Sequence, residues 1–299
     1  MNLEECRKFF AQEVRFAANI STPGLVEAFA SVPREEFLGS PPWQLGSPEQ
    51  RAMSAAGLLR LSYIQTEDPR DLYHNVVISI DPSRDVNNGQ PSALARWIDV
   101  LGLRPGSRVY HLGCGVGYYT AIIAEVVGPG GSVVGAEVLP ELAARAKENL
   151  SNYPNVAVHC GDGTALDPGE CDAMLINAGV THPHPSWLTR LRRRGRLVVP
   201  VTIAATPTIG QGIMVQIVRE PEGFSAQIVS AVAIYSCVGG RDSQIEPLLK
   251  KSLASGALLK LKSIRTDAHE PGETCLMHGG EVCLSSMQIA QAAEPAPAS

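Results

Sequence analysis

One stretch, residues 108–137, constrains the fold of this chain more than any other. It holds a short apolar run, three closely spaced glycines, an apolar stretch of helical character and a second apolar run that ends in Glu137. This order is typical of a right-handed βαβ unit in a parallel sheet. Such a unit binds small molecules at the carboxyl edge of its strands, where glycines let a ligand approach the main chain.

The glycine spacing favours one class of nucleoside cofactor. Gly113, Gly115 and Gly117 form a Gly-x-Gly-x-Gly turn, whereas a dinucleotide fingerprint needs its third glycine where Tyr118 stands. Glu137 follows Gly113 by about 24 residues, where a carboxylate can accept hydrogen bonds from both hydroxyls of a ribose. The turn therefore favours S-adenosylmethionine over NAD.

Composition and charge limit the class of protein. The chain has 299 residues, of which 44% are hydrophobic and 18% charged, as in a globular protein with a substantial core. A net charge of -5 gives no electrostatic reason to expect nucleic acid or an anionic membrane as a partner. The start lacks signal-peptide features, and the seven scattered cysteines fit reduced thiols, so we expect a cytoplasmic protein.

Strand and helix patterns alternate along the middle of the chain. This alternation predicts an α/β fold with a mostly parallel seven-stranded sheet, helices on both faces and an antiparallel last strand. Before it we expect helices over residues 3–19 and 22–30 and a loop-rich insertion over 40–70 with one helix near 50–60. The expected regions are an N-terminal helical and loop region (1–106), a cofactor domain (107–240), a helix and hairpin extension (241–291) and a disordered tail (292–299).

Several short motifs resemble those of the protein-L-isoaspartate O-methyltransferase family. Residues 32–37 match its VPRxxF element, residues 113–120 its GxGxGYxT turn, and 161–163 its GDG element. Residues 171–173 and 195–201 are similar to its YDA and GGRLVxPV elements, in the same order. The resemblance implies a Rossmann-like class I methyltransferase that uses S-adenosylmethionine.

The resemblance also implies a set of cofactor-binding residues. The three glycines would line the cofactor, the acid after the second strand would hold the ribose, and the Asp-Gly pair of the GDG element would meet the adenine. With their neighbours, the expected cofactor-binding residues are His111, Gly113, Cys114, Gly115, Gly117, Tyr118, Glu137, Val138, Asp162 and Gly163.

Two departures from the family pattern concern the expected active site. The family has a serine in a Thr-Ile-Ser-Gln-Pro loop, and Gly89 stands at that position here, preceded by Asn87 and Asn88. His111 replaces an acid at the end of the first strand and is a candidate base, because imidazole titrates near neutral pH. The candidate catalytic residues are therefore His111, Asn88, Asn87 and Asn177, although a strand-end histidine and turn asparagines need no catalytic role.

We therefore expect a methyltransferase that transfers a methyl group to a carboxylate, or to another O or N nucleophile, of a peptide or small molecule. Isoaspartyl repair and modification of a small molecule or modified peptide both remain open. A non-catalytic protein that binds S-adenosylmethionine is a further alternative, and Tyr118 disfavours an NAD enzyme. No metal is expected, because Cys275, His278 and Cys283 offer only three ligands and the two cysteines straddle a predicted hairpin.

Overall fold

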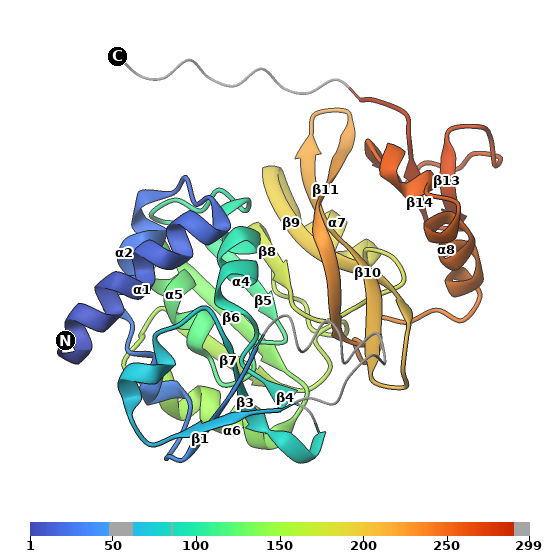
Figure 1. Cartoon of the computed structure of the whole chain (residues 1–299). Helices are drawn as coiled ribbons and strands as arrows, with labels where there is room; N and C mark the ends of the chain where they lie inside the picture. Colours follow the sequence, from blue (N-terminus) through green and yellow to red (C-terminus); the bar gives the residue numbers. More distant parts are fainter. Residues whose placement is uncertain (48–61, 85, 290–299) are drawn as a thin grey trace. The chain divides into compact units, whose positions relative to one another are not determined.

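The chain forms two compact units, Met1–Asp162 and Gly163–Ser299. The computed structural model describes residues 1–47, 62–84 and 86–289 (Figure 1). This division places no boundary at residue 106, because the second N-terminal helix packs directly on the first helix of the predicted cofactor domain. The described residues include no helix that is long and apolar enough to cross a bilayer.

The described residues of the first unit form five α-helices and three short 3-10 helices. The predicted N-terminal pair is confirmed, and the first helix begins with a capping box in which Asn2 and Glu5 exchange hydrogen bonds. The α-helices are α1 (Leu3–Ala18), α2 (Pro23–Ser31), α4 (Pro91–Asp99), α5 (Tyr118–Val127) and α6 (Pro140–Asn149). The 3-10 helices are η1 (Arg34–Phe37), η2 (Pro69–Leu72) and η3 (Pro82–Arg84).

A small antiparallel sheet occupies the region expected to be rich in loops. Its strands, in the order β2-β1-β3-β4, are β1 (Trp43–Gly46), β2 (Ile64–Thr66), β3 (Val77–Asp81) and β4 (Val86–Asn87). The loop prediction is wrong for the first two strands, because Trp43 and the Leu45 side chain pack on a local apolar cluster that includes Ile78. The helix expected near residues 50–60 lies outside the described residues.

The predicted βαβ unit is confirmed in the first unit of the chain. Strands β5 (Arg108–Leu112), β6 (Ser132–Glu137) and β7 (Val156–Cys160) run parallel in the order β5-β6-β7. Helix α5 connects β5 to β6, and α6 connects β6 to β7. The carboxyl ends of β5 and β6 therefore lie side by side, with Leu112 paired to Ala136.

The VPRxxF element fixes the N-terminal helices in an aromatic core. The Arg34 side chain is fully buried, and its guanidinium donates to the carbonyl oxygens of Leu72 (2.6 Å), His74 (3.2 Å) and Val76 (3.1 Å). It also lies over the rings of Phe10 and Tyr118. These contacts compensate the buried charge, although Arg34 Nε has no hydrogen-bond partner among the described residues, and they attach the chain before β3 to the core.

The second unit begins with one parallel strand pair and continues in antiparallel strands. β8 (Cys171–Ile176) pairs in parallel with β9 (Leu191–Ala204), and α7 (Pro185–Arg190) connects them. β10 (Ile209–Glu220) and β11 (Gly223–Tyr235) follow as an antiparallel pair. The sequence predicts that the helix after Pro185 runs to about Arg194 and is capped by Gly195. Instead, α7 ends at Arg190, and the chain between Leu191 and Arg196 forms a bulge in β9.

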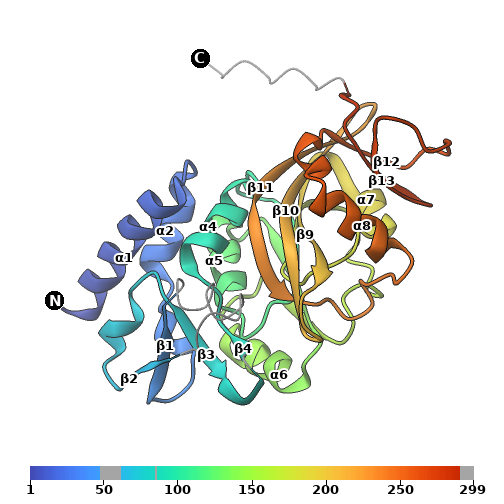
Figure 2. The same cartoon turned by 45° about the vertical axis from the view of Figure 1, so that its right-hand side comes forward.

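The C-terminal extension adds a helix and three short strands to the second unit. These elements are α8 (Ile245–Ala254), η4 (Ala257–Lys260), β12 (Ser263–Arg265), β13 (Cys275–Gly279) and β14 (Val282–Ser285). The strand order β11-β12-β14-β13 is antiparallel throughout, so antiparallel pairing extends well beyond a single last strand (Figure 2).

Two predictions for the extension concern its helix and its hairpin. The predicted hairpin is confirmed. The sequence also predicts that Ser243 and Glu246 form a capping box for the helix, but Asp242 accepts the hydrogen bonds from the Gln244 and Ile245 amides at the start of α8. Asp242 can do so because its side chain lies nearer the free N–H groups of the first turn. The predicted tail over residues 292–299 lies outside the described residues.

Candidate cofactor and active site

The glycine turn after β5 is fixed to the end of β6 by main-chain hydrogen bonds. The amide groups of Gly113 and Cys114 both donate to the carbonyl oxygen of Ala136, at 2.8 and 3.1 Å, and the Gly117 amide donates to the Cys114 carbonyl at 2.9 Å. Gly113, Gly115 and Gly117 have φ values of +75°, +57° and +93°. Side chains rarely tolerate this backbone region, so the turn needs glycine.

Two of these glycines serve different purposes. A Cβ atom at Gly117 would lie 2.8 Å from Leu150 Cδ1, so this glycine allows α5 to start against α6. A Cβ atom at Gly115 would have no other protein atom within 4 Å. The open space beside Gly115 is where a ligand can approach the bare main chain.

Glu137 faces the glycine turn, as the sequence predicts. Its Oε2 accepts a hydrogen bond from the Gly115 amide at 2.9 Å, and its Oε1 accepts one from the Leu139 amide at 3.0 Å. Only 6% of the residue is exposed. Two main-chain donors therefore hold the carboxylate in place, and its remaining lone pairs are available to two hydroxyl groups.

Three further residues are expected near the cofactor. Val138 directly follows the Glu137 carboxylate in the chain, and Asp162 and Gly163 follow strand β7. Val138 is 39% exposed, as suits an apolar contact with a flat base. The Gly161 amide donates to the Glu137 carbonyl at 2.9 Å, which brings the start of the GDG element to the end of β6. Asp162, half-buried, ends the first unit, and Gly163, buried, begins the second.

His111 lies deep in the first unit, one residue before the end of β5. It is 1% exposed, and its Nδ1 lies 2.9 Å from the hydroxyl of Thr120 on α5. Its Nε2 is buried and has no hydrogen-bond partner among the described residues. Burial lowers the pKa of His111 to about 4, which makes the imidazole neutral and a weak base at pH 7. This corrects the expectation of a group that accepts a proton near neutral pH.

Two expected cofactor contacts have side chains directed into the core. The Tyr118 ring is fully buried among Phe29, Phe37 and Tyr119, so the predicted cofactor contact of Tyr118 falls to its main chain and stays a prediction. The Cys114 thiol packs against Gly135 of β6. Burial, together with the nearby Glu137 charge, raises the pKa of this thiol well above its usual range, so it is not a nucleophile.

The loop before α4 contains the serine-to-glycine departure. Asn87 Oδ1 accepts a hydrogen bond from the Gly89 amide at 2.9 Å, and the Tyr119 hydroxyl donates to the Gly89 carbonyl at 3.5 Å. Gly89 has φ +71°, and a Cβ atom there would lie 2.8 Å from Leu94 Cδ2. The loop is therefore built for glycine, and a serine does not fit its present conformation.

Asn88 is the polar residue of this loop that lacks a partner. Its main chain donates to the Ile78 carbonyl at 2.8 Å, while its side-chain amide nitrogen is buried without a partner among the described residues. The residue is 8% exposed. An unpaired buried donor is costly, so a ligand that accepts from it gains affinity.

Asn177 and a cysteine–histidine cluster belong to the second unit. Asn177 directly follows β8 and is half-buried, and its catalytic assignment stays a prediction.

His269 lies beside Cys275, His278 and Cys283, so the premise of only three possible metal ligands is wrong. Sequence spacing gave little sign of His269, because it comes from the loop before the hairpin.

Comparison with known proteins identifies the family. The family model described as protein-L-isoaspartate(D-aspartate) O-methyltransferase (PCMT) matches residues 49–241. The chain belongs to this family. It is therefore a class I methyltransferase that depends on S-adenosylmethionine, in agreement with the glycine turn and the Glu137 carboxylate.

Curated members of the PCMT family are about 30% identical to the chain. Protein-L-isoaspartate O-methyltransferase 1 of Archaeoglobus fulgidus is 32% identical over 205 residues, which cover 67% of this chain and 82% of that protein. The Thermotoga maritima enzyme is 30% identical over 185 residues, which cover 60% of this chain. The match spans half the length of the Thermotoga protein.

Solved structures of the same family share the fold. A protein-L-isoaspartate O-methyltransferase superposes with a TM-score of 0.62 at 23% identity, covering 82% of this chain and 69% of that one. A Plasmodium falciparum PCMT in complex with S-adenosyl-L-homocysteine gives a TM-score of 0.56 at 17% identity, covering 78% and 98%. At these identities the likeness concerns the Rossmann-like methyltransferase fold alone.

Proposed function

We propose that this protein transfers the methyl group of S-adenosylmethionine to a carboxylate of a peptide. The observation that carries the proposal is the burial of His111, which is 1% exposed, because this burial lowers its pKa to about 4 and leaves no effective base there at pH 7. Methyl transfer to an alcohol or ammonium group needs a base, whereas a carboxylate is already ionised at pH 7. A buried imidazole of this kind suits a carboxylate acceptor.

The residues of the glycine turn fit the cofactor. The open space at Gly115 gives room beside the main chain, and Glu137 is held by two amides with lone pairs left for a ribose. When bound, S-adenosylmethionine supplies an electrophilic methyl group on a sulfonium. The protein's part is to orient the acceptor in line with that methyl and to exclude water.

We assign the recognition of the acceptor carboxylate to Asn88. Gly89 removes the hydroxyl that the family presents in this loop, and its positive φ and the nearby Leu94 side chain disfavour a serine there. The side-chain amide of Asn88 is the neighbouring donor without a partner among the described residues. A hydrogen bond from this amide to a carboxylate is charge-assisted, and it would replace the missing hydroxyl contact.

The test is transfer of a labelled methyl group to a peptide with one isoaspartyl residue and to the same peptide with a normal aspartyl residue. We expect a base-labile methyl ester, because esters of carboxylates release methanol in alkali. Asn88→Ala should lower kcat/KM by about 10–100-fold, the value of a hydrogen bond to a charged group, while Asn152→Ala, at an exposed asparagine, should not. A base-stable product would contradict a carboxylate acceptor.

The Gly89 loop favours a second candidate, a methyltransferase for the carboxylate of a small molecule or modified peptide without isoaspartyl repair. The chemistry at the methyl group is the same, but the acceptor differs. Cofactor binding with no ester formed on the isoaspartyl peptide, followed by ester formation on another carboxylate, would support this candidate.

A further inference from the structure

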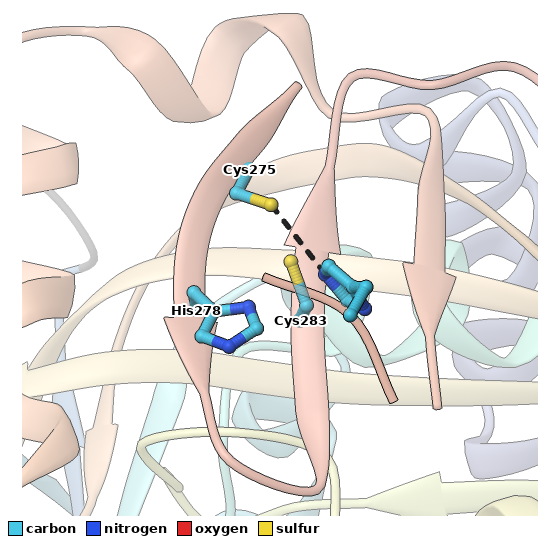
Figure 3. A group of neighbouring side chains, drawn as sticks. Cys275, His278 and Cys283 are labelled. Carbon is cyan, nitrogen blue, oxygen red and sulfur yellow. Dashed lines mark hydrogen bonds between the residues drawn. The ribbon is translucent and has the colours of Figure 1, made fainter. Parts of the chain in front are cut away.

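Four potential metal ligands converge in the C-terminal extension, outside the cofactor site. His269 lies in the loop between β12 and β13, Cys275 and His278 lie on β13, and Cys283 lies on β14. One ligand atom from each residue lies within 4.8 Å of all the others. Figure 3 shows the hairpin side chains, with a dashed line for the contact between Cys275 Sγ and His269 Nε2, which are 3.5 Å apart.

The spacing of these atoms is close to that of a tetrahedral zinc site. Zinc bond lengths of about 2.0 Å to nitrogen and 2.3 Å to sulfur place the donor atoms about 3.3–3.8 Å from one another. The 3.5 Å contact between Cys275 and His269 already lies in this range. The other pairs need to approach by at most about 1.5 Å, which side-chain rotation can supply.

The hydrogen bonds around the cluster leave lone pairs on His269 Nε2 and Cys275 Sγ available to a metal ion. The Nδ1 of His269 lies 2.8 Å from the Asp267 carbonyl oxygen, so it carries the proton and donates, and Nε2 keeps its lone pair on the side of Cys275. The Gly272 amide donates to Cys275 Sγ at 3.4 Å. Both contacts are of the kind that orient metal ligands in known sites.

His278 provides an independent sign of a missing partner. Its Nδ1 is buried and has no hydrogen-bond partner among the described residues, although the ring lies edge-on to that of His269 with centroids 4.7 Å apart. A buried imidazole nitrogen without a partner loses its bonds to water and gains nothing in return. A metal ion among the four residues would satisfy it.

A disulfide between Cys275 and Cys283 explains less of this arrangement. Both cysteines are free, and in the β13–β14 register Cys283 lies opposite His278 while Cys275 lies opposite Ser285. A disulfide would use the two thiols but would leave both histidines without a role. A site for one divalent ion uses all four side chains.

We propose that His269, Cys275, His278 and Cys283 bind one Zn²⁺ ion in a closed, structural site. Two thiolates and two neutral imidazoles are the donor set that tetrahedral zinc prefers, and the two thiolates balance its charge. Binding releases the thiol protons to solvent. With four protein ligands, no position remains for a substrate or a reactive water, so the ion holds the structure together and takes no part in methyl transfer.

The extension has a physical need for such an ion. Among the described residues, its strands pair with the longer strands at two positions only, Phe224 with Ile264 and Ser225 with Ser263, and α8 adds a hydrogen bond from the Ala204 amide of β9 to the Glu246 carboxylate. Segments of this size rarely bury enough apolar surface to fix their loops, and metals commonly supply the missing stability. The ion would tie the loop containing His269 to the hairpin.

The test begins with the full chain, purified without a histidine tag under reducing conditions. Elemental analysis should find about one zinc per chain. After exchange with Co²⁺, the protein should show the visible absorption of tetrahedral cobalt and a sulfur-to-cobalt charge-transfer band. Protein that is folded and reduced but takes up neither metal would overturn the proposal, as would a Cys275–Cys283 disulfide found by mass spectrometry in protein without zinc.

Matched variants separate the four ligands from other cysteines and histidines. His269→Gln and Cys283→Ser should each weaken zinc binding, measured by competition with a chelator, by at least about tenfold, since even loss of an outer contact commonly costs that much. Cys160→Ser and His74→Gln, at an exposed cysteine and an exposed histidine, should bind zinc like the parent. Unchanged zinc affinity in both ligand variants would contradict the site, and His269→Gln, in a loop, keeps the test independent of hairpin folding.

Discussion

The glycine turn of the first unit and the Cys/His cluster of the second are both sites for a small ligand, but they are built from different parts of the chain. The turn uses main-chain amides and one carboxylate within residues 108–137. The cluster uses four side chains on a loop and two strands. A site made of main chain needs glycines at fixed spacing and is visible in sequence. A site made of side chains depends on which loop the folded chain brings next to which strands, and residue spacing does not show this.

The largest expected effect would separate the two sites by removing metal. We expect a chelator to reduce amide protection over residues 266–285 on the order of a thousandfold, about 4 kcal/mol, because structural zinc sites contribute folding free energy directly. Residues 109–137 of the first unit should keep their protection. Hydrogen exchange measured by mass spectrometry checks this. A uniform loss of amide protection over the whole chain would show that the ion does not stabilise the extension specifically.

The next effect concerns the buried histidine of the first unit. The folded pKa of His111 is about 4, below its ordinary value of 6.5, so the unfolded chain binds a proton that the folded protein excludes. Its contribution to stability is therefore complete above pH 6.5 and falls by about 3 kcal/mol as the pH drops to 4. Denaturant titrations should show this loss in the parent and in His74→Gln but not in His111→Gln. If the free energy of unfolding fell equally with pH in all three proteins, His111 would not be the source of the stability loss.

A smaller effect tests the carboxylate of the turn. Glu137→Gln keeps an oxygen for the Gly115 amide but replaces the charged acceptor for the ribose, so we expect affinity for S-adenosylmethionine to fall about 30-fold, about 2 kcal/mol. Glu125→Gln, at an exposed glutamate on α5, is the matched control. Titration calorimetry measures the affinity of both variants for S-adenosylmethionine. An affinity within a factor of about two of the parent would argue against ribose binding by Glu137.

The smallest effects distinguish the two glycines of the turn. Gly117→Ala brings a Cβ atom to 2.8 Å from Leu150, so we expect a loss of about 1–3 kcal/mol in the free energy of unfolding. Gly115→Ala meets no protein atom, so its stability loss should stay near 1 kcal/mol, while its affinity for S-adenosylmethionine should fall more. Denaturant titration and calorimetry on both variants make the comparison. If Gly115→Ala lost stability but no affinity, the open space beside it would not be the cofactor site.

Much of the fold could be predicted from periodicity and turn residues. The βαβ unit, the first two helices and the C-terminal hairpin were expected within a few residues, because each is specified by local patterns. Strands β1 and β2 were missed, since their pairing depends on a cluster formed with Leu72 and Ile78 far along the chain. Gly195 looked like a helix cap but lies in a bulge, which only strand pairing can reveal.

The candidate site was predicted to a similar extent. The sequence pointed to Glu137 and the glycines through spacing alone. It gave His111 the wrong chemistry, because the pKa of an imidazole follows from its burial and not from its position at a strand end. It gave no sign that the Tyr118 ring packs against helices that precede it by about 80 residues or more in the chain.

The sequence by itself determined the form of the cofactor turn, because glycine is the residue that permits positive φ beside a ligand and an acid at the end of the next strand can reach the same place, and its family motifs predicted the class of enzyme. Tertiary structure decided the protonation of His111, the unpaired amide of Asn88 and the meeting of His269 with the hairpin. Burial and proximity in space set these properties, and neither is written in the spacing of residues along the chain.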